Sequence, residues 1–233
     1  MKVSIVVPVL NEAQYVRRFL QRARRDPPDE IVLVDGGSDD GTVEIARIAA
    51  ARDLPLRIER STSGLARQLN TGAALARGDV LFFPYVDCRL PEGWSAAIRA
   101  AMGDPAVAGG AFRLGFDRAG IFRTVAAVAN LRTALGLGPL GDQGIFVRRP
   151  IFEALGGYRE DRLLEDLDFS RRLRTLGEVR VLTPSIETST RRWRAHGLVR
   201  TALTNWFYLG LHFAPAARMW CDRYREYRVR THD

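Results

Sequence analysis

Apolar and polar positions alternate in a regular way along the first hundred residues of the chain. Short runs rich in β-branched residues predict buried strands, and longer stretches with apolar residues every three or four positions predict amphipathic helices. The predicted strands are 3–9, 30–34, 54–59 and 80–83, and the predicted helices are 13–24, 43–52, 65–76 and 91–102. Strands and helices that alternate four times predict a doubly wound, mostly parallel α/β sheet with right-handed crossovers.

Shorter and less regular elements follow this first part. We expect strands at 107–116, 145–148, 178–182 and 186–188 and helices at 121–135, 150–155 and 163–176, with a helical tail from Ala195. Residues 136–144 are rich in glycine and predict a mobile or substrate-facing loop. The chain therefore predicts one α/β domain over residues 1–194. A helical extension over 195–233 is expected to pack on this domain, on a membrane or on a partner subunit.

Charge and cysteine content narrow the classes of partner. The 233 residues carry 35 Lys and Arg against 27 Asp and Glu, a formal net charge of +8, which suits an anionic partner. The basic residues are spread along the chain and form no recognisable nucleic-acid module, so we expect no nucleic acid. Cys88 and Cys221 lie far apart and indicate no disulfide framework, which favours a reducing cytoplasm. No signal peptide or membrane span is apparent.

The strand at 30–34 ends at Asp35, and two glycines and several small polar residues follow it. Open α/β sheets bind ligands at the carboxyl ends of their strands, beside turns of this kind. Asp35 could accept hydrogen bonds from a ring N–H or from a ribose hydroxyl. The alternative is a structural turn in which Ser38 or Asp39 caps the next helix.

Five motifs occur in register, and together they resemble family 2 glycosyltransferases with the GT-A fold. They are Val6-Val-Pro-Val-Leu-Asn-Glu12, Val34-Asp-Gly-Gly-Ser-Asp-Asp-Gly-Thr42, Arg67-Gln-Leu-Asn-Thr-Gly72, Asp87 and Glu165-Asp166. The resemblance covers residues 2 to about 176 and implies a single Rossmann-like sheet, with a nucleotide-binding half at about 1–104 and an acceptor half at about 105–194. Residues 141–148 and 191–193 resemble a bacterial subgroup that includes carotenoid glycosyltransferases of the diaponeurosporenoate type.

The resemblance implies transfer of a sugar from a nucleotide-diphosphate-sugar to an acceptor, with inversion by direct displacement. Asp166 is then the candidate general base, with Glu165 beside it. The alternative for this acidic pair is a purely structural one, because the first turn of a helix favours carboxylates.

The resemblance also implies a divalent metal, Mg²⁺ or Mn²⁺, which would neutralise charge on the leaving diphosphate. Family members carry an acidic triplet after the fourth strand, whereas this chain has Tyr85-Val86-Asp87 with one carboxylate. One carboxylate and the substrate phosphates suffice for a weak site. His196 is a second candidate ligand. A metal-independent enzyme that uses Arg side chains, and a purely helix-capping Asp87, are the alternatives.

The remaining candidate residues divide by the part of the donor they would contact. The candidates for the nucleotide are Pro8, Glu12, Asp35, Arg67 and Val86. Gln143 is a candidate contact for the donor sugar or the acceptor, and Asp142 a weaker one. Arg191, Arg192 and Trp193 could close over the diphosphate, because Arg binds phosphate in a bidentate manner.

Residues 198–213 predict an apolar helix that bears a Trp and is flanked by Arg. Such a helix suits a membrane interface and a lipid acceptor. The alternative, which the pattern slightly favours, is packing on the sheet or on a second subunit. We therefore expect a lipid or small-molecule acceptor and a location in the cytoplasm or at the inner face of the plasma membrane. The rival functions are a non-catalytic or differently specialised GT-A nucleotide-sugar-binding module and, with less support, a nucleotidyltransferase.

Overall fold

The computed structural model describes residues 1–50, 54–213 and 220 of the chain. Within them one seven-stranded sheet has the order β3-β2-β1-β4-β6-β5-β7. Its strands are β1 (Val3–Val9), β2 (Glu30–Asp35), β3 (Leu56–Arg60), β4 (Val80–Phe83), β5 (Val107–Phe116), β6 (Ile145–Arg148) and β7 (Glu178–Thr188). Only β6 runs antiparallel to its neighbours, β4 and β5. The predicted mostly parallel α/β sheet is therefore confirmed.

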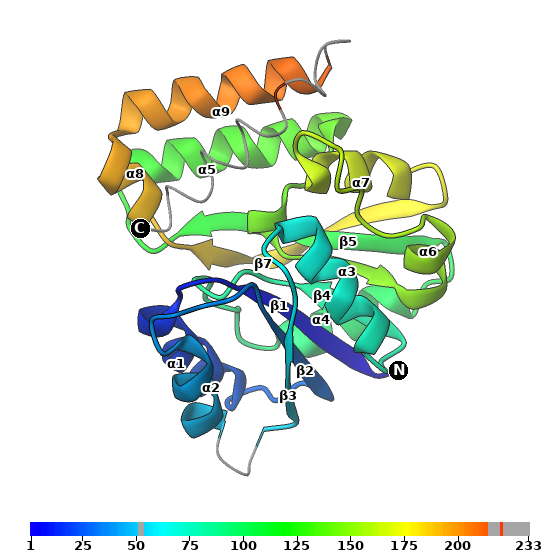
Figure 1. The fold of residues 1–233 in the computed structure, drawn as a ribbon. Coiled ribbons are helices and arrows are strands. Elements are labelled where there is room, and N and C mark those ends of the chain that lie inside the picture. The colour runs from blue at the N-terminus through cyan, green and yellow to red at the C-terminus, as the bar shows by residue number, and fades with distance from the viewer. Residues whose placement is uncertain (51–53, 214–219, 221–233) are drawn as a thin grey trace.

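Helices cover both faces of this sheet, and a pair of helices lies beyond β5 and β7 (Figure 1). They are α1 (Ala13–Ala23), α2 (Thr42–Ala50), α3 (Leu65–Leu75), α4 (Trp94–Met102), α5 (Ile121–Arg132), α6 (Arg149–Ala154), α7 (Glu165–Leu173), α8 (Arg191–His196) and α9 (Leu198–His212). The described core divides into one cluster on the side of α1, α2 and α4 and another on the side of α3, α6 and α7.

The two core clusters follow from the alternation of side chains along a strand. In β1, Val3, Ile5 and Val7 belong to one cluster while Val6 belongs to the other. A strand buried on both faces is mostly apolar, which explains the apolar runs in the sequence; the buried Ser4 of β1 is the exception in this strand, and it donates to Glu30 Oε2. Gly72 in α3 sits directly over Val6, where a Cβ atom would collide with the valine side chain. The glycine lets α3 approach the sheet closely.

Two of the expected elements differ in the structure. The strands predicted at 178–182 and 186–188 are one strand, β7, because the pairing with β5 continues across an irregularity. Phe112 lies opposite Leu182 and Arg113 opposite Ser185, so two residues of β7 are extra. The helix predicted at 121–135 ends as α5 at Arg132 and continues as a π-helical turn, Thr133–Leu137, which includes Gly136 with a φ of 89°.

The described part of the C-terminal extension packs on the domain, as one of the three alternatives predicted. Tyr208 of α9 shares an apolar cluster with Leu163, Leu164 and Leu167 at the start of α7. The predicted boundary at residue 194 falls within α8 and stays a prediction. Arg52 of the predicted second helix, together with residues 214–219 and 221–233, including Cys221, lies outside the described residues. None of the helices described is both long and apolar enough to span a bilayer.

Candidate active site

The turn after β1 and the turn after β2 are bonded to each other. The Asn11 backbone N–H donates to Ser38 Oγ at 2.9 Å, and Asn11 Oδ1 accepts from the Asp39 backbone N–H at 3.0 Å. Asn11 has a φ of 54°, a left-handed conformation that Asn tolerates better than most residues. Two segments distant in sequence thus form one rigid rim at the carboxyl ends of the parallel strands.

Asp35 is buried at the centre of this rim. Its carboxylate accepts hydrogen bonds from the backbone N–H groups of Gly37 at 3.2 Å and Ser38 at 3.0 Å. The helix-capping contacts come from Asp40, which accepts from the backbone N–H of Ala13 and of Thr42. Burial alone would raise the pKa of Asp40, but these hydrogen bonds outweigh burial and lower it. Asp40 therefore makes the capping contacts that were expected of Ser38 or Asp39. Asp35 instead orients the glycine turn.

Arg191 of α8 joins two of the predicted acids. Its Nη1 and Nη2 donate to the two carboxylate oxygens of Glu12 at 2.7 and 2.6 Å, and its Nε lies 3.2 Å from Asp87 Oδ2. The guanidinium also stacks over the Tyr15 ring, 4.5 Å from the centroid. Burial lowers the pKa of Arg191, but the Glu12 hydrogen bonds and the charges of Asp87 and Glu12 outweigh burial and raise it above its ordinary value. A fixed cation therefore lies beside Asp87.

Asp166 is buried in the first turn of α7. Its Oδ2 accepts from the Gly141 backbone N–H and its Oδ1 from the Leu167 backbone N–H, both at 2.8 Å. Leu164, two residues earlier, has a φ of 54°, which is rare for a bulky side chain. Strained residues cluster at functional sites, and the positive-φ non-glycine residues of the described chain are this one and Asn11. Both stand directly before a predicted site acid.

Tyr85 connects the turn after β4 to the Asp166 site. A Cβ atom on Gly141 would collide with Tyr85 Oη and would lie 3.2 Å from Asp166 Oδ2. Tyr85, Gly141 and Asp166 therefore meet at one point, and Asp87 follows two residues after Tyr85. These contacts link the turns that carry Asp35, Asp87 and Asp166 along the same rim of the sheet.

Gln143 is fully buried in the glycine-rich segment, within a 3₁₀ turn, Gly141–Gln143. Its Oε1 accepts from Thr133 Oγ1 at 3.0 Å and from the Leu140 backbone N–H at 3.2 Å, while its Nε2 donates to the Phe112 carbonyl at 3.2 Å. These bonds fix the segment that was expected to be a mobile loop. The predicted sugar or acceptor contact of Gln143 stays a prediction, and the side chain has a clear architectural role.

The other predicted residues lie in several environments. Pro8 is buried in β1 opposite Val34, and Val86 is buried in the core. Arg67 is exposed, and it donates to Glu160 Oε2 at 2.6 Å and to Thr62 Oγ1 at 2.7 Å. These contacts give Arg67 partners in Glu160 and Thr62, and its predicted nucleotide contact stays a prediction.

Arg192 and Trp193 support helix α8. Arg192 Nη2 lies 3.4 Å from Asn205 Oδ1 of α9, and Trp193 packs edge-on against Phe116 and Phe122. Of the three residues expected to close over a diphosphate, Arg191 lies beside the predicted acids. The phosphate contacts of Arg192 and Trp193 stay predictions.

Sequence reasoning missed two buried polar residues that position the site. Gln68 Nε2 donates to the carbonyls of Val9 and Val34, both at 2.9 Å, and so ties the ends of β1 and β2 together beneath Gly36. Arg132 is buried beside Gln143; burial lowers its pKa, and the charges of Asp142 and Asp166 partly oppose this. An Arg at the end of an apolar helix gave no sequence signal, whereas Gln68 stood inside a recognised motif.

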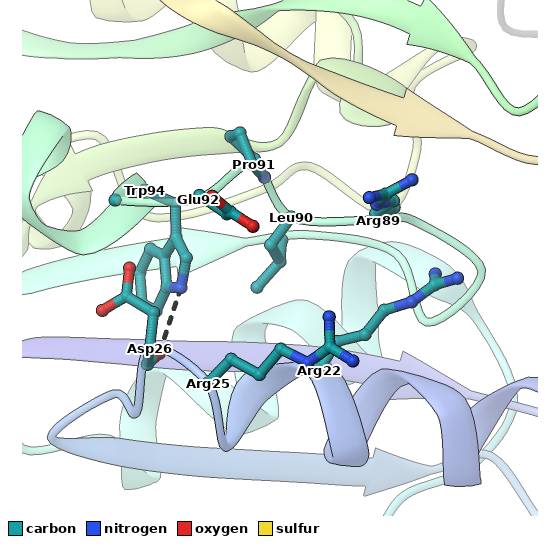
Figure 2. Close-up of a pocket in the computed structure, with 9 residues that line it drawn as sticks. Arg22, Arg25, Asp26, Arg89, Leu90, Pro91, Glu92 and Trp94 are labelled. Carbon is teal, nitrogen blue, oxygen red and sulfur yellow. Dashed lines mark hydrogen bonds between the residues drawn. The ribbon is translucent and has the colours of Figure 1, made fainter.

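A cavity of about 550 Å³ lies apart from these residues, beside the C-terminal end of α1 (Figure 2). Arg22 and Arg25 line one wall, and Arg89 lies across from them, with Asp26 and Glu92 also at the wall. Burial and the nearby charge of Arg89 lower the pKa of Arg22. None of the predicted site residues lines this cavity.

A family model described as Glycosyl transferase family 2 matches residues 4–146, which includes the turns at Asp35, Asp87 and Gly141. The chain belongs to glycosyltransferase family 2. This confirms the predicted enzyme class, a glycosyltransferase. Its membership of the carotenoid-type subgroup stays a prediction.

Curated relatives of this family 2 glycosyltransferase have related names. The PGL/p-HBAD biosynthesis glycosyltransferase of Mycobacterium bovis (strain BCG / Pasteur 1173P2) is 35% identical over 175 residues, which cover 72% of this chain and 68% of that protein. Glycosyltransferase AglE of Haloferax volcanii is 36% identical over 98 residues, 40% of this chain. That match covers 32% of AglE, so the chain spans about a third of the length of this relative.

Solved structures share the GT-A fold. The mannosyltransferase PcManGT from Pyrobaculum calidifontis, in complex with GDP-Man and Mn²⁺, superposes with a TM-score of 0.66 and 22% identity over 99% of this chain and 72% of that one. Staphylococcus aureus TarS 1–349, in complex with UDP-GlcNAc, has a TM-score of 0.63 and 20% identity over 82% of this chain and 59% of that one. These likenesses confirm the fold class.

Proposed function

We propose that this family 2 glycosyltransferase moves a sugar from a nucleotide-diphosphate-sugar to an acceptor by direct, inverting displacement with Asp166 as the general base. The observation that supports this proposal most is the contact chain that links Asp35, Glu12, Arg191, Asp87, Tyr85 and Asp166 along the carboxyl-end rim of the sheet. Open α/β sheets bind their ligands at this rim.

The backbone contacts of Asp166 suit a base. Each of its oxygens accepts a hydrogen bond from a backbone N–H, and a carboxylate is an acceptor that can take the proton of an acceptor hydroxyl. The two contacts hold the carboxylate in a single orientation, so little reorganisation is needed when it takes the proton. Glu165 shares the first turn of α7 and would add negative charge on the acceptor side.

Charge that develops on the leaving diphosphate needs a positive partner. Arg191 supplies a permanent cation beside Asp87, held in place by Glu12. In this proposal Arg191 orients the diphosphate, and the turns at Pro8, Asp35 and Val86 hold the nucleotide base and ribose.

A divalent metal fits this site only in part. The described residues contain no group of three or more His, Cys, Asp and Glu side chains that could hold an ion, and His196 joins no such group. Asp87 could bind Mg²⁺ or Mn²⁺ if donor phosphates supplied most of the remaining ligands, as is usual for these ions. When bound, the ion would neutralise diphosphate charge. Because Arg191 is already paired with Asp87, we expect weak metal affinity.

The acceptor is proposed as a lipid or a small molecule that carries a hydroxyl or a carboxylate nucleophile. The mycobacterial relative is named as a biosynthesis glycosyltransferase. This name and the family name support sugar transfer rather than a non-catalytic nucleotide-sugar-binding role. If the acceptor is itself a carboxylate, Asp166 would contribute through positioning more than through proton removal.

The test is donor binding and transfer with matched variants. Thermal-shift titrations with UDP- and GDP-sugars, with and without Mn²⁺, identify the donor, and product formation is then measured with Asp166→Asn. We expect this variant to bind donor normally and to lose about 10²-fold or more of the transfer rate. Glu153→Gln, an exposed carboxylate on α6, is the control that should keep full rate.

Two outcomes would contradict the proposal. If Asp166→Asn transferred sugar at the parental rate, Asp166 would not be the base. If the parental protein bound donor but transferred to no acceptor tested and did not hydrolyse the donor, the non-catalytic GT-A module would be the better description.

A further inference from the structure

Most of the large apolar side chains that are exposed among the described residues lie on two helices and directly after them. Of fourteen large apolar residues that are exposed there, ten lie within residues 121–137 and 198–213. Monomeric soluble proteins rarely expose apolar side chains in one contiguous patch, whereas scattered single ones are normal. We call the exposed apolar residues of these two segments the α5/α9 face.

Helix α9 has an apolar stripe that is turned away from the core. In α9, Val199, Leu203, Trp206 and Phe207 follow the helical spacing of one face and are each at least half exposed. The buried positions of the same helix, Thr201 and Tyr208, lie seven residues apart on the opposite face. An ordinary surface helix shows the reverse arrangement, with the apolar stripe toward the core.

Helix α5 and the π-helical turn after it also expose apolar side chains. Ile121, Val128 and Leu135 are spaced by seven residues, Leu131 lies between Val128 and Leu135, and all four are exposed. The buried positions of α5 are Ala126 and Arg132, and Phe122 packs against Trp193. Packing within the protein therefore accounts for only part of the apolar residues of these two segments.

The two helices are held together at both ends. Near the start of α5, Phe122 packs against Trp193 of α8, which leads directly into α9, with ring centroids 6.1 Å apart. Beyond the end of α5, Leu140 packs on the apolar cluster that includes Tyr208 and Leu209. Figure 1 shows α5 and α9 on the same side of the molecule, beyond β5 and β7. The exposed apolar residues of the two segments therefore lie on the same side of the molecule, linked through α8 and Leu140.

The charge of this surface has a single sign. Residues 118–141 and 188–213 contain no Asp or Glu. Their exposed charged side chains are cationic, namely Arg118, Arg123, Arg194 and Arg200. An apolar face bordered by cations matches an anionic lipid surface, where apolar groups enter the acyl boundary and Arg meets the headgroups. A second copy of the same face would instead bring like charges together.

We propose that the α5/α9 face docks on the surface of a membrane that contains anionic lipid, with both helices lying in the plane of the interface. Outward Trp206, Leu203, Leu131 and Leu135 enter the boundary, and the exposed Arg residues contact lipid phosphates. The proposal goes beyond sugar transfer and does not depend on it, because docking is measured without donor or acceptor.

The experiment is co-sedimentation of the intact chain with phosphatidylcholine vesicles prepared with and without phosphatidylglycerol. We expect binding to the vesicles that contain phosphatidylglycerol, and weaker binding as salt is raised. Leu203→Ser/Trp206→Ser should weaken this binding by about tenfold or more. Arg123→Gln/Arg200→Gln should weaken it about tenfold at low salt and should abolish the preference for anionic lipid.

Matched controls separate vesicle binding through the α5/α9 face from nonspecific binding. Ile48→Ser/Leu176→Ser removes two apolar side chains of similar exposure elsewhere, and Arg47→Gln/Arg57→Gln removes two other exposed cations. Both should leave binding unchanged, and circular dichroism checks that every variant folds.

Three results would overturn the proposal. The first is no binding to either kind of vesicle at low salt. The second is an equal loss of binding in the control variants. The third is sedimentation equilibrium, without lipid, that shows a dimer which Leu203→Ser/Trp206→Ser dissociates; the face would then be covered by a second copy.

Discussion

Replacement of Arg191 tests the central contact of the candidate site. The side chain is 19% exposed, and it bonds both oxygens of Glu12, whose side chain is 4% exposed, as well as one oxygen of Asp87, whose side chain is 11% exposed. Arg191→Met keeps much of the side-chain volume but removes the cation from two buried carboxylates. Loss of one partner from a buried pair costs about 3–5 kcal/mol, so we expect a loss of this size in the free energy of unfolding.

The pH dependence of this contribution follows from the raised pKa of Arg191. A cationic group whose folded-state pKa lies above its unfolded value contributes stability at every pH below the unfolded value. The contribution is lost only as the pH rises through the folded-state pKa. The part of the loss in unfolding free energy of Arg191→Met that comes from the missing arginine charge should therefore be the same at every pH in the neutral range.

The assay is urea unfolding followed by tryptophan fluorescence, with Glu12→Gln and the double variant completing a cycle. We expect the double variant to be more stable than the sum of the single losses predicts, by at least about 1 kcal/mol, because either change alone breaks the same contact. Arg57→Met is the control, since Arg57 and Glu59 form an exposed pair at 3.4 Å that should contribute less than about 1 kcal/mol. Losses that simply add, or an Arg191→Met loss no larger than that of the control, would refute the reasoning.

Three further outcomes are expected. Gly141→Ala should keep the fold but reduce sugar transfer by about tenfold or more, measured as initial rate, because the new Cβ would collide with Tyr85 Oη and crowd Asp166 Oδ2; an unchanged rate would contradict that geometry. Gly72→Ala should lower the free energy of unfolding by about 1–3 kcal/mol in urea, because Val6 leaves no room for a methyl group; a neutral result would mean that α3 shifts freely. Burial, with the charge of Asp87, raises the pKa of the Cys88 thiol, so alkylation of the native protein at neutral pH, mapped by peptide mass, should spare Cys88 until urea is added. Rapid native labelling would show that this region opens.

The sequence predicted much of the candidate site because its motifs are local. Asp35 and Asp166 each stand at the boundary of an element, and the apolar pattern alone indicates where those elements begin and end. The alternation of strand and helix in the first half predicted Asp35 at the carboxyl end of its strand, whereas the family resemblance, and not the apolar pattern, singled out Asp166. Gln68 stood within a recognised motif, but its hydrogen bonds to the carbonyls of Val9 and Val34 required the folded backbone.

Other features depend on contacts between distant segments, which the sequence does not encode locally. Glu12 and Arg191 are 179 residues apart, and their bidentate contact exists only because α8 returns to the start of the chain. Gln143 was expected in a loop and Arg132 was not singled out, whereas the two side chains are buried together. The two segments of β7 form one strand because β5 beside them is continuous, and an interruption at Thr183 and Pro184 does not break the pairing on either side.

The chain by itself determined the α/β class, the mostly parallel sheet and the position of Asp35 at the end of a strand, because strands buried on both faces are visible in the sequence as apolar runs. The family resemblance, and not the apolar pattern, singled out Asp87 and Asp166. Tertiary structure alone decided which cation meets which acid, which polar side chains are buried, and that the apolar stripe of α9 faces outward. The physical reason is that the spacing of apolar residues fixes which positions share a helix face, but only packing against other elements decides whether that face meets the core or solvent.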